Sequence, residues 1–350
     1  MAPLRRRPVA AALLAVGVGV AVALARAERE RRSAAARPPR QRRERRTALR
    51  KGEPLAEGLR RVILGQLELA IELLESYPEG AGDETVHEIR KALKRVRALI
   101  RLLRRELGLK RHARENAALR DCAQRLAAGR DAEVILATLD GILQRHPGKL
   151  FGSPAVQALR AQLVAEREAA AAHAIRDPQL RAAVARDLRA TATRAERWTL
   201  RERRRKLLAP GLDRLYRQGH RGLRAARRGA GRGGDGGASA LHVWRKRVKD
   251  LRYAAETIDR GGKSFAYVRR IAREADRLGE ILGEEHDLAL LDQGVRQRSA
   301  LFAAERKTRK RLLKAIARRR RRLHKRARRD GERLYRRKPK RFERRMLDHV

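Results

Sequence analysis

Cysteine and aromatic residues are scarce in this sequence. The chain has 350 residues, and its single cysteine, Cys122, cannot form an intrachain disulfide. Aromatic residues make up only 3% of the chain. Proteins that bind single-stranded nucleic acid stack its bases on aromatic side chains, so this scarcity disfavours specific single-strand binding. We interpret Cys122 as a small core residue, because cysteine is among the residue types most often buried.

Acidic residues are also few relative to basic ones. The chain has 41 Asp and Glu against 89 Lys and Arg, which gives a formal net charge of +48. This charge repels itself in the folded state, and a polyanionic partner would relieve the repulsion. Candidate partners are nucleic acid, an anionic membrane surface and inorganic polyphosphate. The apolar residues are mostly Ala, Leu and Val in long Pro-free stretches, which predicts an all-α fold.

The motifs of common enzyme classes are absent. The sequence has no phosphate-binding loop, no Gly-x-Ser-x-Gly nucleophile motif and no zinc-peptidase helix. Few acids lie near the basic motifs described below, which leaves little material for catalysis by paired carboxylates. His87 and His242 have no His or Cys at ligand spacing. We therefore predict a protein that is not an enzyme and that has no cofactor and no metal site.

The N-terminal region divides into an apolar segment and a basic linker. Residues 1–25 contain an uninterrupted apolar run, 9–25, which is close to the lower length limit of a membrane-spanning helix. We interpret it as a membrane anchor, with a cleaved secretory signal as the alternative. Residues 26–53 form an Arg-rich linker, and its positive charge predicts that the rest of the chain lies in the cytoplasm, tethered to the inner membrane.

A basic helix motif occurs twice in the remaining residues, 54–350. The first copy spans residues 86–97 and the second 241–253, with a shift of 155 positions. Matching positions hold His87, Arg90, Lys91, Lys94 and Arg97 in the first copy, and His242, Arg245, Lys246, Lys249 and Arg252 in the second. On a helix each set forms one stripe, and the opposite stripe is apolar. The repeat predicts two pseudo-symmetric halves, about 54–228 and 238–350, joined by a Gly-rich loop.

Each stripe can be a solvated helix face or an anion-binding face. Solvated faces interleave acids with Lys or Arg, because like charges four residues apart destabilise a helix by about a few tenths of a kcal/mol. The first stripe, extended by Arg101, holds five Lys or Arg and no acid, whereas the position matching Arg101 in the second copy is Glu256. We therefore favour anion binding. The two histidines are interpreted as anion contacts, with an incidental place near the helix start as the alternative.

These residues resemble the CHAD family (conserved histidine α-helical domain). The family pattern is a His-x-x-Arg-Lys-x-x-Lys-x-x-Arg helix in each of two four-helix halves, and the segments 282–287 and 336–342 also match it. The resemblance covers about 54–350. It implies two helical bundles whose basic helices line a central groove that binds inorganic polyphosphate. The implied groove residues are the ten motif residues, with Arg101 and Tyr253 beside them. No CYTH triphosphate-hydrolysing domain is recognisable, so the resemblance implies a stand-alone binding module, free in the cytoplasm or on polyphosphate granules.

Two alternatives to polyphosphate binding stay open. Downstream of the second copy, the pattern predicts helices over 267–284, 287–301 and 305–329, and the last of them is very basic. A non-specific nucleic-acid-binding protein that uses this last helix is the first alternative. An accessory subunit of a phosphohydrolase is the second, and it would need a separate catalytic partner.

Overall fold

The regular structure of this chain consists of helices. A computed structural model describes residues 47–77, 83–127, 130–146, 148, 150–173, 177–200, 205–229 and 235–350, and these contain no strand. Residues 47–350 form one compact unit. The all-α fold predicted from the composition is confirmed. The apolar segment 9–25 and the linker up to residue 46 lie outside the described residues, and no helix in the described part is long and apolar enough to cross a membrane.

Two sets of helices follow one another along the chain. The first comprises α3 (Leu55–Glu75), α4 (Asp83–Leu102), α5 (Arg104–Leu107), α6 (Leu109–Arg125), α7 (Arg130–Arg145), α8 (Pro154–His173) and α9 (Pro178–Glu196). The second comprises α10 (Arg205–Gly229), α11 (Asp235–Ile258), α12 (Ala266–Gln297), α13 (Arg306–Leu334) and α14 (Pro339–Met346), with short 3-10 turns η1 (Lys263–Phe265) and η2 (Ser299–Phe302). The basic motifs lie on α4 and α11.

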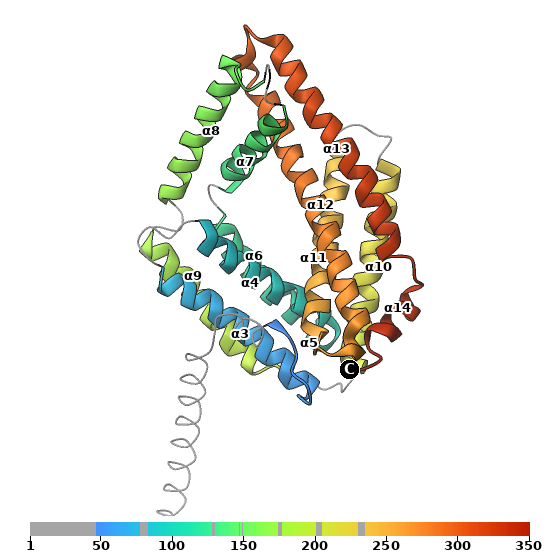
Figure 1. Cartoon of the computed structure of the whole chain (residues 1–350). Helices are drawn as coiled ribbons and strands as arrows, with labels where there is room; N and C mark the ends of the chain where they lie inside the picture. The colour runs from blue at the N-terminus through green and yellow to red at the C-terminus, as the bar shows by residue number, and fades with distance from the viewer. Residues whose placement is uncertain are drawn as a thin grey trace, which may run out of the picture. The chain divides into compact units, whose positions relative to one another are not determined.

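The helices of the two sets pack in the same cyclic order. In the first set, α3 packs on α4 and α9, and α6 packs on the same two helices. In the second, α10 packs on α11 and α13, and α12 packs on the same two helices. The four helices of each set thus form a ring, and the motif helices α4 and α11 pack on each other and join the two rings (Figure 1). The second ring begins with α10, whereas the sequence analysis assigned the residues of α10 up to 228 to the first half.

Apolar stripes of the motif helices are part of the core. Ile89, Leu93 and Val96 on α4 are fully buried, and so are Trp244 and Val248 on α11. These are the apolar positions predicted from the helical period, so that part of the prediction is confirmed.

Close helix packing around Trp244 depends on glycine. A Cβ atom on Gly222 of α10 would lie 2.5 Å from Trp244 Cδ1, and one on Gly331 of α13 would lie 2.6 Å from its Cζ2. Glycine at both positions therefore lets α10 and α13 approach the indole of α11.

One helix differs from the sequence-based expectation. Helix α12 runs without a break through residues 284–287, where two helices were predicted to meet, so that prediction was wrong. Glu285 is buried there and accepts hydrogen bonds from Arg320 of α13 at 2.9 Å and 3.0 Å, and its Oε1 lies 3.0 Å from His324 Nε2. A charged run that looks like a turn in the sequence is thus the buried, paired middle of a long helix.

Candidate functional site

Two ion pairs connect the motif helices directly. Arg101 Nη1 on α4 donates to Asp250 Oδ1 on α11 at 2.9 Å. Arg95 Nη2 on α4 donates to Glu256 Oε2 on α11 at 3.2 Å. The side chain of Asp250 is only 7% exposed, so its negative charge acts in a poorly hydrated environment. These contacts fix cations of α4 against acids of α11.

The two ion pairs are reciprocal. With the shift of 155 positions, Asp250 is the counterpart of Arg95, and Glu256 is the counterpart of Arg101. Each pair therefore joins the same two positions of the motif, with the helices exchanged. Reciprocal contacts of this kind are what a two-fold relation between like surfaces produces. They support the predicted duplication, which stays a prediction.

Cations gather where α4 and α11 meet. We call Arg97, Arg101, Lys246 and Arg247 the junction cluster; Arg101 and Arg247 both donate to Asp250, at 2.9 Å and 3.1 Å. Burial and then the neighbouring Arg101 lower the pKa of Arg97 to about 10. Burial and then Arg247 lower the pKa of Lys246 as well. Four cations therefore surround one carboxylate, and the neighbouring cations add to the effect of burial on the pKa values of Arg97 and Lys246.

Asn116 of α6 supports this cluster from the side. Its Oδ1 accepts hydrogen bonds from Arg97 Nε at 3.2 Å and from Arg101 Nη2 at 3.1 Å. An amide oxygen orients the two guanidinium groups but adds no negative charge. Asn116 therefore orients Arg97 and Arg101 without neutralising them.

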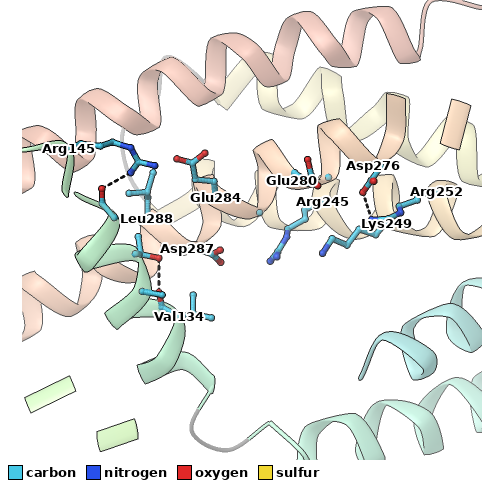
Figure 2. Close-up of a pocket in the computed structure, with 15 residues that line it drawn as sticks. Val134, Arg145, Arg245, Lys249, Arg252, Asp276, Glu280, Glu284, Asp287 and Leu288 are labelled. Atoms are coloured by element: carbon cyan, nitrogen blue, oxygen red, sulfur yellow. Dashed lines mark hydrogen bonds and ion pairs between the residues drawn. The ribbon is translucent and has the colours of Figure 1, made fainter. Parts of the chain in front are cut away.

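A second group of motif cations lines a pocket on the other side of α11. We call Arg245, Lys249 and Arg252 the pocket cluster; they line a pocket of about 470 Å³ between α11, α12 and α7. Figure 2 shows Arg245 and Lys249 extending side by side toward the open space of this pocket. Acids share the lining: Asp276, Glu280, Glu284 and Asp287 of α12. The acids and cations that line the pocket therefore nearly balance in charge, whereas the junction cluster has four cations around one acid.

Arg252 is paired with one acid of its own helix and one acid of α12. Its Nε donates to Glu256 Oε1 at 2.5 Å, and its Nη1 is paired with Asp276. Burial lowers the pKa of Arg252, but the hydrogen bond and charge of Glu256, together with Asp276, outweigh it, so the pKa is raised above its ordinary value.

The two motif histidines occupy different environments. His87 is exposed on α4. His242 is partly buried, its ring centroid lies 4.4 Å from that of His286, and its Nδ1 has no hydrogen-bond partner within the described residues. Burial, followed by the charges of Lys246, His286 and Arg245, lowers the pKa of His242 to about 4. His242 is therefore neutral near pH 7.

The remaining predicted residues take individual places. Arg90 Nη1 donates to the carbonyl oxygen of Ala123 on α6 at 2.9 Å. Lys91 Nζ lies 3.3 Å from Glu88 Oε1 on its own helix, and Lys94 is partly buried.

Tyr253 is 5% exposed. Its ring centroid lies 5.6 Å from the guanidinium carbon of Arg95 and 5.7 Å from that of Arg252. A ligand contact by Tyr253 stays a prediction, and this burial disfavours it.

The comparisons with known proteins place the chain in a family. A family model described as CHAD domain matches residues 65–296, which include both motifs. The chain belongs to the CHAD family. The structure is also similar to the crystal structure of the CHAD domain from the plant Ricinus communis, with a TM-score of 0.50 and 21% identity over 87% of this chain and 94% of that chain. At this identity the likeness shows the fold alone. The search of curated proteins returned no match.

Several residues of this CHAD site are missed by sequence reasoning. Arg95 and Arg247 lie off the predicted stripe, and Asn116 lies on another helix. Asp250 was the one available signal, because it is an acid inside an otherwise cationic motif. In the part of the chain that the structure describes, no group of three or more His, Cys, Asp or Glu could hold a metal ion, and the expectation of no metal site stays a prediction.

Proposed function

We propose that this CHAD-family chain binds inorganic polyphosphate, without catalysis, through the cations of α4 and α11. The observation that carries the proposal is the junction cluster, where both motif helices contribute cations around one buried carboxylate. Burial, and after it the neighbouring cations, lowers the pKa values of Arg97 and Lys246, and an anion bound there would offset the repulsion between these cations.

The chemistry of polyphosphate fits this arrangement. Polyphosphate is a flexible polymer with a negative charge on each repeat, so several cations held by packed helices can bind it at once. Binding releases condensed counterions from the polyphosphate, as it does from nucleic acid, and affinity should fall as salt is added. Arg pairs well with phosphate oxygens because its planar donors match their geometry.

The absence of catalysis is part of the proposal. Three of the acids beside the motif cations are engaged in pairing: Asp250 with Arg101, and Glu256 and Asp276 with Arg252. Carboxylates that accept hydrogen bonds from arginine in this way do not form a free pair of carboxyl groups for general acid–base catalysis. A location in the cytoplasm, on polyphosphate granules or at the inner membrane, belongs to the same proposal.

The test compares two pairs of charge reversals. Lys94→Glu with Lys249→Glu should weaken polyphosphate binding by about tenfold or more at about 150 mM salt, because each replaces a cation of the motif by an anion. The control reverses Lys110 and Arg224, which are exposed and lie outside the motifs. Affinity is measured by titration with polyphosphate of defined length. Equal losses from both pairs would show that bulk charge, rather than the motif helices, binds the ligand.

A further inference from the structure

Helix α13 carries a charged face that the proposed polyphosphate site does not use. It packs on α10 and α12 through one apolar stripe, in which Leu312, Ile316, Leu323 and Leu334 are buried. On the opposite side lies what we call the outer row: Arg311, Lys314, Arg318, Arg322, Lys325 and Arg329, all of them exposed. Their spacing of three and four residues places them in one line along the helix.

The acids of the neighbouring helix do not neutralise the outer row. Glu284 of α12 pairs with Arg319 at 2.6 Å and Glu285 pairs with Arg320 at 2.9 Å, and both arginines lie on the flanks of α13. Helix α13 itself has no acid between Arg306 and Arg329. Among the described residues, the one ion pair of the outer row is the loose contact of Arg329 with Asp330 at 3.8 Å.

This arrangement costs stability in the unbound chain. Like charges four residues apart repel each other on a helix, and the outer row contains several such pairs. A solvated face of ordinary composition would alternate them with acids. The repulsion is relieved when a partner brings negative charges along the whole row.

We propose that the outer row of α13 is a second polyanion-binding surface, separate from the motif helices, and that its partner is double-stranded nucleic acid. The row is about 27 Å long at 1.5 Å per residue, which is most of one duplex turn of about 34 Å. Its residues are fixed on one straight, packed helix, and a stiff duplex presents phosphates at fixed positions to such a row. Four of its six cations are Arg, whose donors pair with phosphate oxygens.

The structure favours a duplex over a membrane surface. A helix that lies in a membrane interface buries its apolar face among the lipids. The apolar face of α13 is already covered by α10 and α12, and the exposed large apolar residues of the described chain, Leu109, Phe151 and Val243, all lie on other segments. What remains on α13 is an electrostatic contact with no base-reading element, so binding should be independent of sequence.

The experiment compares two variants with the same loss of charge. The first is Arg311→Gln, Arg318→Gln, Arg322→Gln and Lys325→Gln in the full chain. The control is Arg105→Gln, Lys110→Gln, Arg111→Gln and Arg224→Gln, which removes four exposed cations from α5, α6 and α10. Gln keeps a helix propensity close to that of Arg and Lys, and thermal melting verifies that both variants fold. Affinity for a random-sequence DNA duplex of about two turns is measured over a range of salt concentrations.

The salt dependence decides the outcome. We expect the α13 variant to bind the duplex about tenfold or more weakly, and the slope of log affinity against log salt to fall by about 3, because about 0.9 is lost per phosphate contact. The control should change the slope by less than about 1. Polyphosphate affinity of the α13 variant should stay within about twofold, which separates this inference from the polyphosphate site. Equal slopes for the two variants would overturn it, and so would an unchanged duplex slope accompanied by lost binding to phosphatidylserine vesicles.

Discussion

Arg97 and Arg252 occupy the same position of the repeated motif, yet their surroundings are opposite. Arg97 donates to the neutral amide of Asn116, and burial, followed by the charge of Arg101, lowers its pKa to about 10. Arg252 is held by Glu256 and Asp276, and its pKa is raised. The same motif position therefore holds a cation without a paired acid among the described residues in one half, which we call a frustrated cation. In the other half it holds a cation paired with acids, which we call a compensated cation.

The comparison separates two tasks that a cation can perform. A compensated arginine contributes to the folded state, because its removal leaves carboxylates without their partner. A frustrated arginine contributes to binding, because the ligand provides the negative charge that no acid in the described part of the chain places beside it. We infer that the junction cluster contributes most of the affinity for polyphosphate. The pocket between α11, α12 and α7 contributes most of the local stability.

The largest expected effect comes from exchanging these two arginines for glutamine, one at a time. Arg97→Gln should weaken polyphosphate binding by about tenfold and change the free energy of unfolding by less than about 0.5 kcal/mol, since the lost hydrogen bond is offset by relieved repulsion. Arg252→Gln should weaken binding by less than about threefold and destabilise the fold by about 1–2 kcal/mol, a value discounted for its partial exposure. Chemical denaturation and titration give both quantities.

A reversed result would break the comparison. If Arg252→Gln lost most of the affinity while Arg97→Gln kept it, the ligand would bind in the pocket between α11, α12 and α7 and not at the junction cluster. If the two variants behaved alike, the acids around Arg252 would affect neither polyphosphate affinity nor the free energy of unfolding.

The next effect sharpens the comparison through the two histidines. His242 has a pKa of about 4 in the folded chain, against about 6.5 when unfolded. Burial disfavours its protonation most, and the neighbouring Lys246, His286 and Arg245 disfavour it further. Between pH 6.5 and 4 the unfolded chain takes up the proton first, so the stability present above pH 6.5 is lost as the pH falls.

His242→Gln should remove part of that loss. We expect the difference in unfolding free energy between pH 7 and pH 4.5 to shrink by about 1–2 kcal/mol, discounted for the partial exposure of the ring. His87→Gln is the matched control, because His87 is the same motif position and is exposed. If both substitutions changed the pH dependence equally, the different burial of the two histidines would be irrelevant to stability.

The sequence was sufficient for those features that depend on local periodicity. Apolar positions three and four residues apart predicted the buried stripes of α4 and α11, and Leu93 and Val248 are fully buried as expected. The prediction failed at residues 284–287, because Glu285 is paired with Arg320 and His324 of another helix. Nothing in the local sequence reveals such a partner.

The same limit applies to the site. The stripe of motif cations follows from helical spacing, and the structure brings Arg97, Arg101 and Lys246 near one another. Their division into a junction cluster and a pocket cluster depends on Asp250 and on the acids of α12, which meet them only through tertiary packing. A one-dimensional pattern therefore indicated the cations but could not show which of them the fold neutralises.

The smallest expected effect concerns Tyr253, which the resemblance placed beside the ligand. Its ring is buried between the guanidinium groups of Arg95 and Arg252, so it supports these arginines through cation–π contacts. Tyr253→Phe keeps the ring and removes only the hydroxyl, and polyphosphate affinity should change by less than about twofold. Tyr253→Leu removes the ring face as well and should destabilise the fold by about 1 kcal/mol or more through lost packing. A tenfold loss of affinity in Tyr253→Phe, with unfolding unchanged, would instead show that the hydroxyl contacts the ligand directly.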